Sequence, residues 1–359
     1  MNEDKASRYH RLKRTISIVS LVWGVGLMVA LLATGGSASL RAVARGHVIP
    51  YVVLLSLVNE IVALPLAFYS GFVLERRYGL SNEAVGGWAI DQLKSFGVGI
   101  LLGGGAAQVL YWCIGGSPEH WWLVAGLVFA LLIVGLTNLA PVLLLPLFYS
   151  VKPLARDTLS TRLLRLAERA GARVLGAYEW GLGEKTKKAN AALTGIGRTR
   201  RILVSDTMLA EYSDDEIEVV LAHELAHHVH GDIWKGIAFE SALMLGGFFL
   251  ASRVLRAFVA PLGLAAPDDV AGMPLLLLAA GAVSLVMVPF AHAMSRAFER
   301  RADRFALDLT RNPSAFISAM RRLGAQNLAE ERPSRVVQWL FYSHPPLRER
   351  IAVAEAFKG

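Results

Sequence analysis

The chain has 359 residues, of which 54% are hydrophobic and only 18% charged, and its formal net charge is +8. Soluble domains usually carry about 25% charged residues, and long apolar runs account for the deficit here, which indicates a membrane protein. The basic residues cluster beside those runs, where they set orientation and meet anionic lipid, and no nucleic-acid recognition module is visible. We therefore expect the lipid bilayer, and no nucleic acid, as a partner. The single cysteine, Cys113, excludes an intrachain disulfide and a cysteine-based metal site.

Six apolar runs approach or exceed the roughly 20 residues that a helix needs to cross a bilayer. They lie at about 15–34, 49–73, 95–115, 121–149, 236–258 and 273–296. The predicted regions are a membrane region of four helices (1–150), a catalytic region (151–235), a transmembrane hairpin (236–296) and C-terminal catalytic helices (297–359). In the third run, Gly99 and Gly103 lie four residues apart, a spacing that favours close helix packing.

The charges in the loops between these runs indicate the orientation of the chain. Basic residues crowd the N-terminal tail, the 74–94 loop and the segment after the fourth run. The 259–272 loop carries only acids, whereas Arg41 and Arg45 in the first loop are exceptions to the pattern. We therefore expect an integral multi-pass protein with both termini and both large polar regions in the cytoplasm.

The first polar region begins with a helix that has one apolar face and continues with short strands. Arg173–Trp180 is predicted to be a strand, and Ala189–Leu193 with Arg201–Ser205 to form a hairpin around Gly195 and Gly197. The second polar region is predicted to be helical and is punctuated by prolines.

The stretch SDDEIEVVLAHELAHHVHGD predicts a metal-binding helix. Ser213 and Glu216 form a capping box at its start. His223 and His227 lie one turn apart on one face, so both imidazoles can reach a single ion. Zinc takes imidazole readily and keeps a position open for water, from which the adjacent Glu224 can take a proton and pass it to the leaving amine. The motif therefore predicts one catalytic zinc ion per chain.

A third ligand has to come from elsewhere, because the chain enters a membrane run soon after His227. The sixth run ends in SRAFERRADRFALD, which places Glu299 and Asp303 one turn apart on one face. Spacing alone leaves open whether these acids bind a metal or pair with neighbouring arginines. Since runs five and six form a hairpin, they return the chain to the side of the membrane where His227 lies, and Glu299 follows there. We therefore expect Glu299 to bind zinc and Asp303 to orient a ligand histidine through its second nitrogen.

The stretch from about 71 to 359 resembles the type I CAAX prenyl proteases, zinc-dependent membrane proteases that in turn resemble the HtpX quality-control proteases. The segments that carry the resemblance are ERRYGLSN, Asp91 and Lys94, LPLFYSVKPL, NAALTGIGRTRRILVSDTML, HELAH, the Glu299/Asp303 pair and SHPPLRER. The expected fold is a mainly α, polytopic membrane protein of about six transmembrane helices, with a zincin-like metalloprotease domain that contains a small β-sheet. The family's eukaryotic members have seven spans, one more than is predicted here.

Carried over residue by residue, the resemblance implies the same three ligands and the same base. It also matches Asn190 and Ala191 to an edge strand that pairs with the substrate backbone. His344 and Arg350 match residues near the metal that steady the oxyanion, a role that suits an imidazole or a cation. The residues alone leave open that the segment after His344 simply starts a helix.

We therefore expect an integral membrane zinc metalloendopeptidase that hydrolyses peptide bonds in a peptide or protein, prenylated or membrane-associated. The resemblance implies C-terminal CAAX peptides or, by its HtpX-like branch, damaged membrane proteins, and the residues leave both open. A metal transporter is the alternative from another class, but its ligands would lie at mid-membrane depth. Asn59 and Glu60 in the second run fit either a wet interior or interhelical hydrogen bonds.

Overall fold

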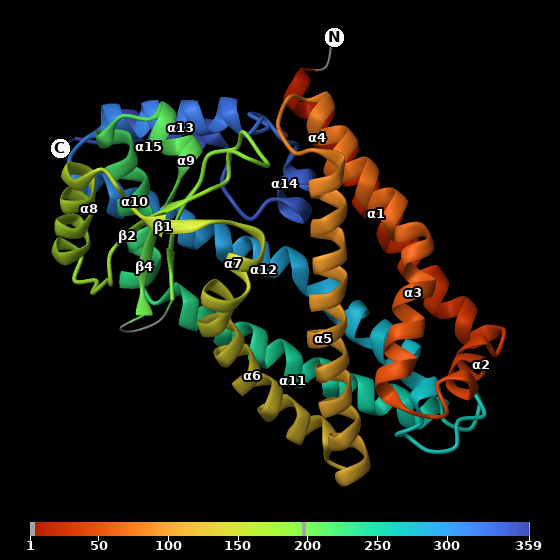
Figure 1. The fold of residues 1–359 in the computed structure, drawn as a ribbon. Coiled ribbons are helices and arrows are strands. Elements are labelled where there is room, and N and C mark those ends of the chain that lie inside the picture. The colour runs from red at the N-terminus through yellow and green to blue at the C-terminus, as the bar shows by residue number, and fades with distance from the viewer. Residues whose placement is uncertain (1–3, 196–198, 359) are drawn as a thin grey trace.

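The computed structural model describes residues 4–195 and 199–358 and shows long membrane helices joined to a smaller part that contains a sheet (Figure 1). Within the described residues, six helical segments are long and apolar enough to cross a membrane. They are Lys5–Ala33, Val48–Arg77, Val85–Gly116, Trp121–Ala140, Asp232–Phe258 and Val270–Thr310. The six predicted spans are confirmed, and most are longer than predicted because polar residues at their ends continue the helix.

The first part of the chain forms four of these spans, connected by shorter helices (Figure 1). Its elements are α1 (Lys5–Ala33), α2 (Gly36–Val43), α3 (Val48–Ala67), the π-helical segment η1 (Phe68–Val73), α4 (Leu74–Arg77), α5 (Val85–Gly116), α6 (Trp121–Leu143) and α7 (Leu145–Phe148). The segment Val48–Arg77 is therefore one span made of α3, η1 and α4.

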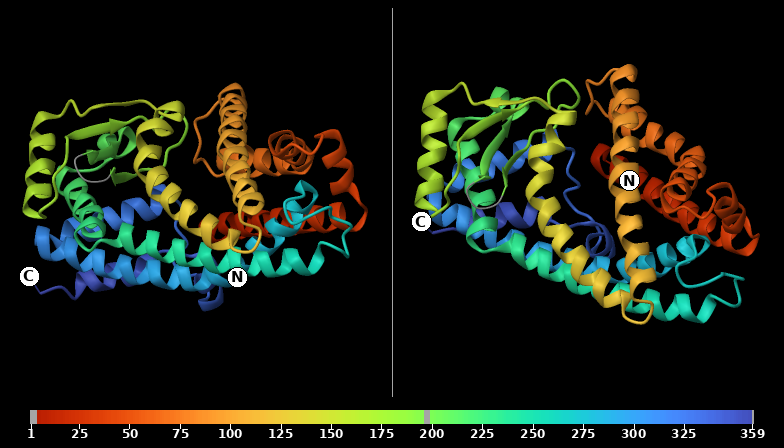
Figure 2. Two further views of the ribbon diagram at one scale, coloured as in Figure 1. Left: turned by 90° about the horizontal axis from the view of Figure 1, so that it is seen from below. Right: turned by 60° about the horizontal axis from the view of Figure 1, so that its bottom comes forward.

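Two long helices, α11 (Asp232–Phe258) and α12 (Met273–Thr310), run side by side through both parts of the molecule (Figure 2). A short 3-10 turn, η3 (Val270–Gly272), precedes α12. Near this turn the two helices pack with α3, α5 and α6 around the buried Tyr51 and Trp121. Because α12 continues without interruption past residue 296, the predicted boundary between hairpin and C-terminal helices falls inside one helix.

The remaining elements surround a small sheet near the other end of α12 (Figure 1). They are β1 (Val151–Pro153), α8 (Asp157–Arg169), β2 (Ala177–Trp180), β3 (Ala191–Thr194), β4 (Arg201–Ser205), α9 (Asp206–Glu211), α10 (Asp214–Val229), α13 (Pro313–Gln326), α14 (Arg335–Phe341) and α15 (Leu347–Glu355). The strand order is β1-β2-β4-β3, and only β2 and β4 are parallel. The predicted small sheet is thus present, with β3 at one edge.

Two strand predictions differ in detail from the structure. β3 and β4 pair in an antiparallel manner, as predicted, although Gly197 lies outside the described residues. The predicted strand Arg173–Trp180 is wrong in its first half, since β2 begins only at Ala177. The chain first turns out of α8 at Gly171, whose φ of +71° is left-handed, so the next residues form a connection rather than a strand.

α10 is the central helix of this part and begins as predicted. Ser213 and Glu216 form the capping box, and Leu221 is fully buried in the core between α10, α8 and α13. The buried Glu216 carboxylate accepts hydrogen bonds from the Ser213 backbone (2.8 Å), the Ser318 hydroxyl and Arg322 Nε (3.0 Å). The helix start is therefore tied to α13 as well as capped.

In the Gly-rich third span, close helix packing occurs at Gly104, where a Cβ would lie 3.3 Å from the Ile49 side chain of α3, but not at the predicted pair, Gly99 and Gly103. A Cβ built at either residue would meet no other atom within 4 Å. The closest approach is at Gly126 in α6, where a Cβ would lie 2.3 Å from the Leu245 side chain of α11. Glycine spacing shows where helices can approach each other, but the partner helix decides where they do.

Candidate metal centre

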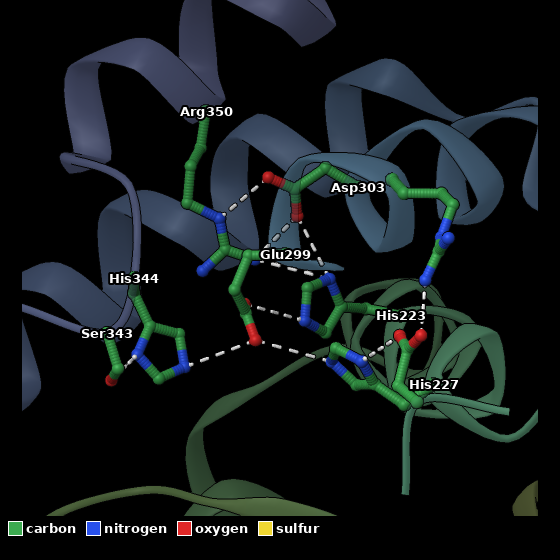
Figure 3. Close-up of polar contacts among 9 residues, drawn as sticks. His223, His227, Glu299, Asp303, Ser343, His344 and Arg350 are labelled. Atoms are coloured by element: carbon green, nitrogen blue, oxygen red, sulfur yellow. Dashed lines mark hydrogen bonds and ion pairs between the residues drawn. The ribbon is translucent and has the colours of Figure 1, made fainter. Parts of the chain in front are cut away.

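The predicted ligands from α10 and α12 converge on one point (Figure 3). His223 and His227 lie one turn apart on α10, with ring centroids separated by 5.1 Å. His223 Nε2 is 3.2 Å from Glu299 Oε2, and His227 Nε2 is 3.3 Å from Glu299 Oε1. One donor atom from each of the three residues lies within 4.8 Å of the other two.

Each histidine is also held through its second ring nitrogen. His223 Nδ1 lies 2.9 Å from Asp303 Oδ1, and His227 Nδ1 lies 3.1 Å from Asp232 Oδ2. An Nδ1–H that donates to a carboxylate leaves Nε2 with a free lone pair directed at the other ligands. Asp303 was expected here, but sequence reasoning missed Asp232. Asp232 directly follows Gly231, whose left-handed φ of +66° turns the chain back towards α10, and an acid after such a glycine is the feature of the sequence that indicates this contact.

This donor set fits a zinc ion. Among the described residues, Glu299 Oε2 is a buried oxygen without a hydrogen-bond donor. A buried carboxylate accepts but cannot donate, so it needs a cation or a donor nearby. Two imidazole nitrogens with one carboxylate form a catalytic zinc set, whereas magnesium and calcium prefer oxygen ligands alone.

The charges around the cluster favour both a cation and a base. Burial lowers the pKa of His223, but the neighbouring carboxylates of Asp303 and Glu299 more than reverse this effect and raise it to about 9. Burial also lowers the pKa of His227, but the carboxylates of Glu299 and Asp232 together outweigh this effect and raise it. Positive charge is therefore stabilised between these acids, as a divalent cation requires. Burial raises the pKa of Glu224, which brings this carboxyl closer to the neutral range where proton transfer works best.

Arg350 and His344 approach the cluster in different ways (Figure 3). Arg350 donates from Nε and Nη2 to the two oxygens of Asp303, at 2.9 and 2.6 Å. This pair is buried, and Arg350 Nη2 also lies 3.3 Å from His223 Nδ1, so Nε and Nη2 of Arg350 are engaged on the side of Asp303 and His223. His344 Nε2 is 3.5 Å from Glu299 Oε1, on a side chain that is 59% exposed. His344 therefore faces the cluster from its open side.

A cavity of about 380 Å³ lies in front of the cluster and contains all the predicted catalytic and substrate-binding residues. They are Asn190, Ala191, Glu224, His344 and Arg350. His223 and Glu299 also line this cavity. A bound peptide would thus meet the metal ligands, the base and the edge strand in one space.

β3 presents part of its backbone to this cavity. Ser205 N–H donates to the Asn190 carbonyl at 2.9 Å, and Asn190 N–H donates to the Ser205 hydroxyl at 3.0 Å. Ladder bonds in antiparallel pairs alternate, so Ala191, opposite Val204, directs its N–H and C=O away from β4. Ala191 can therefore pair with an added strand through its backbone, whereas the Asn190 backbone is already engaged.

Comparison with known proteins identifies the family. Residues 153–358, more than half of the chain, match the family model described as peptidase family M48. The chain belongs to peptidase family M48. Residues 2–150 of this M48 member match a second model, described as the CAAX prenyl protease N-terminal region with five membrane helices. Over the described part of that region, this chain has four membrane-spanning helices and the short helix α2.

Individual relatives agree with this assignment. The uncharacterized metalloprotease YhfN of Bacillus subtilis (strain 168) is 31% identical to this M48 member, covering 98% of this chain and 84% of its own. CAAX prenyl protease 1 of Saccharomyces cerevisiae is 27% identical and covers 84% of this chain and 70% of its own. The crystal structure of S. mikatae Ste24p has the same fold, with a TM-score of 0.87 and 23% sequence identity. The match covers 98% of this chain and 88% of the Ste24p chain. The chain is thus a multi-pass membrane zinc metalloprotease of family M48.

Proposed function

We propose that this protease holds one zinc ion with His223, His227 and Glu299 and uses Glu224 as the general base. When bound, zinc supplies Lewis-acid activation of water and of the scissile carbonyl. The observation that carries the proposal is the convergence of three donor atoms at a cavity that is also lined by Ala191 of the edge strand β3. An ion-transport pathway has no need for a peptide-binding edge beside its ligands.

The residues around the ion have separate tasks. A substrate peptide binds as an added strand, with its backbone paired to the N–H and C=O of Ala191, and this pairing lays an extended chain across the cavity. Glu224 accepts a proton from the attacking water and later donates it to the leaving amine. Asp303 and Asp232 keep Nδ1–H of the two histidines engaged, so Nε2 stays directed at the ion.

His344 is the better placed donor for the oxyanion that develops on the scissile carbonyl. Its Nε2 approaches from the open side of the cluster, where a peptide carbonyl would lie. Arg350 contributes positive charge at longer range, since its Nε and Nη2 are engaged by Asp303. A donor or cation fixed before the reaction lowers the barrier because it needs no reorganisation when the charge develops.

We propose further that the substrate is the C-terminal CAAX peptide of a prenylated protein. The yeast relative is named CAAX prenyl protease 1 and covers most of this chain. In addition, a cavity of about 800 Å³ lies among the membrane helices. Its lining combines apolar side chains such as Leu55 and Phe96 with the polar Asn59 and Glu60. A mainly apolar cavity among the membrane helices suits a lipid chain attached to the peptide.

The catalytic site is proposed to face the cytoplasm. α1 begins, and α4 ends with Arg76 and Arg77, on the side of the molecule that carries the sheet (Figure 1). Arg41, an exception to the charge pattern on the opposite side, forms an ion pair with Asp269, whose side chain is only 3% exposed. Arg41 and Arg45 aside, the basic residues of the loops gather on the side of the sheet, which supports a cytoplasmic catalytic site.

Cleavage assays on the purified, zinc-loaded protein test the reaction and its substrate together. The substrates are a farnesylated CAAX peptide, the same peptide without the farnesyl group, and unfolded casein, with Glu224→Gln as the matched inactive control. We expect kcat/KM for the farnesylated peptide to exceed that for the bare peptide by at least about tenfold, since burial of a lipid chain adds binding energy. Cleavage of casein alone would assign the protein to quality control, and activity in Glu224→Gln would overturn the mechanism.

A further inference from the structure

The cytoplasmic end of α1 is built into the walls of the active-site cavity. His10 lines that cavity, and one of its ring nitrogens lies 2.8 Å from the Leu328 carbonyl. One turn further, Arg14 donates to Glu330 at 2.7 Å and to the Tyr342 hydroxyl at 3.2 Å. Tyr342 lies on the segment that leads to His344. The first membrane helix therefore contacts one wall of the cavity directly.

A half-buried ionic cluster joins the same end of α1 to the opposite wall. The carboxylate of Glu75, at the end of the second span, accepts a hydrogen bond from the Tyr9 hydroxyl and pairs with Lys13 Nζ at 2.8 Å. Its other oxygen pairs with Lys188 Nζ at 2.9 Å. The Glu75 side chain is 12% exposed, while those of Lys13 and Lys188 are 31% and 35% exposed, so water screens these ion pairs only in part. The cluster links two membrane helices to the loop between β2 and β3.

Lys188 lies on the segment that delivers the edge strand, two residues before Asn190. The segment is also held by the loop that follows the second span, because Lys187 N–H donates to the Leu80 carbonyl at 2.9 Å. Ala189 exchanges two hydrogen bonds with the Asn327 side chain, at 3.1 and 3.2 Å. The backbone entering β3 is therefore clamped from the membrane helices on one side and from the end of α13 on the other.

We infer that Lys188, through its ion pair with Glu75, is a positioning residue that fixes edge strand β3 relative to the membrane helices. The inference rests on the proposed pairing of substrate with β3. Ala191 lies three residues after Lys188, and each strand residue spans about 3.3 Å, so a displacement of the Lys188 backbone also shifts Ala191. Misplacement of a binding edge by about 1 Å can reduce catalysis as much as 100-fold. The first span is thus part of the peptide-binding apparatus, and more than a membrane anchor.

Lys188→Met is the informative variant, because the Glu75 carboxylate keeps Lys13 and Tyr9 as partners and its negative charge stays compensated. Lys188→Arg preserves the charge and tests rescue. Lys187→Met is the matched control, since it removes the same charge from the same segment but from an exposed side chain. All proteins are compared as zinc-loaded full chains.

Two readouts separate positioning from a general structural effect. The first is kcat/KM for two fluorogenic peptides, one long enough to lie along the four residues of β3 and one truncated to the scissile bond. We expect Lys188→Met to lower kcat/KM of the long peptide by about 10- to 100-fold, mainly through KM, and that of the short peptide far less. Lys188→Arg should stay within about twofold of wild type because it keeps the charge that pairs with Glu75, and Lys187→Met should do so because it is a surface substitution.

The second readout is hydrogen exchange at the β3 amides, which does not depend on catalysis. Exchange should be faster in Lys188→Met than in Lys187→Met. Unchanged exchange, or an equal loss with both peptides accompanied by loss of zinc, overturns the inference. If the wild-type protein cleaves no peptide, the proposed function fails, while the exchange comparison still decides whether Lys188 fixes β3.

Discussion

Asp232 offers a sharp test of how the metal ligands are held. Its carboxylate is 5% exposed and lies 3.1 Å from His227 Nδ1. It also forms an ion pair with Arg301 and approaches Lys235 Nζ at 3.5 Å. Asp232→Asn keeps the size and an acceptor oxygen but removes the negative charge that strengthens the bond from His227. Asp232→Ala removes the acceptor as well.

The expected magnitudes follow from this difference. Loss of a partner behind a ligand histidine typically costs 10- to 100-fold in metal affinity. Because the amide oxygen of Asn can still accept from Nδ1–H, we expect about tenfold, or roughly 1.4 kcal/mol, for Asp232→Asn. Asp232→Ala should approach the upper end, about 100-fold or roughly 2.7 kcal/mol. Arg301 is 39% exposed, so its unpaired charge can turn to water and adds little to the cost.

Zinc dissociation constants from competition with a chelator provide the measurement. Asp215→Asn is the matched control, because Asp215 lies in the first turn of α10, away from the cluster, with a side chain that is 52% exposed. Its zinc affinity should equal that of wild type. Equal zinc affinity in wild type, Asp232→Asn and Asp232→Ala would refute the argument that Asp232 fixes His227.

Other expectations concern stability and metal dependence. Burial raises the pKa of Glu216, but its hydrogen bonds more than offset this effect and hold the pKa below the usual 4.5. Its stabilisation is therefore present above pH 4.5 and lost below it; Glu216→Gln should cost about 1–3 kcal/mol in thermal unfolding at neutral pH, and the gap should close on acidification. Gly126→Ala should lower the melting temperature in detergent through overpacking worth about 1–3 kcal/mol, whereas Gly135→Ala, with open space around it, should not. A zinc chelator should abolish cleavage, and added zinc should restore it.

The part of the site that follows local rules could be predicted from the sequence. Helical spacing places His223 and His227 on one face, and the span count alone brings Glu299 to the same membrane face. The family assignment and the six spans are confirmed, whereas the ligand and catalytic roles stay predictions that the geometry supports.

The contacts that depend on non-local packing could not be predicted. Asp232 reaches His227 only because of the left-handed turn at Gly231, and the sequence shows a glycine but not its φ. The pairing of Glu75 with Lys188 joins residues more than a hundred positions apart, and no periodicity encodes it. Which helix faces which glycine depends on the assembled bundle in the same way.

The most direct test of the central claim is the zinc content of purified Glu224→Gln and Glu299→Ala, measured alongside peptide cleavage. We predict one zinc ion per chain in wild type and in Glu224→Gln, with cleavage in Glu224→Gln reduced at least about 100-fold for want of a general base. Glu299→Ala should lose both zinc and cleavage. Normal zinc content and cleavage in Glu299→Ala would contradict the account, because the third ligand would then lie elsewhere in the chain.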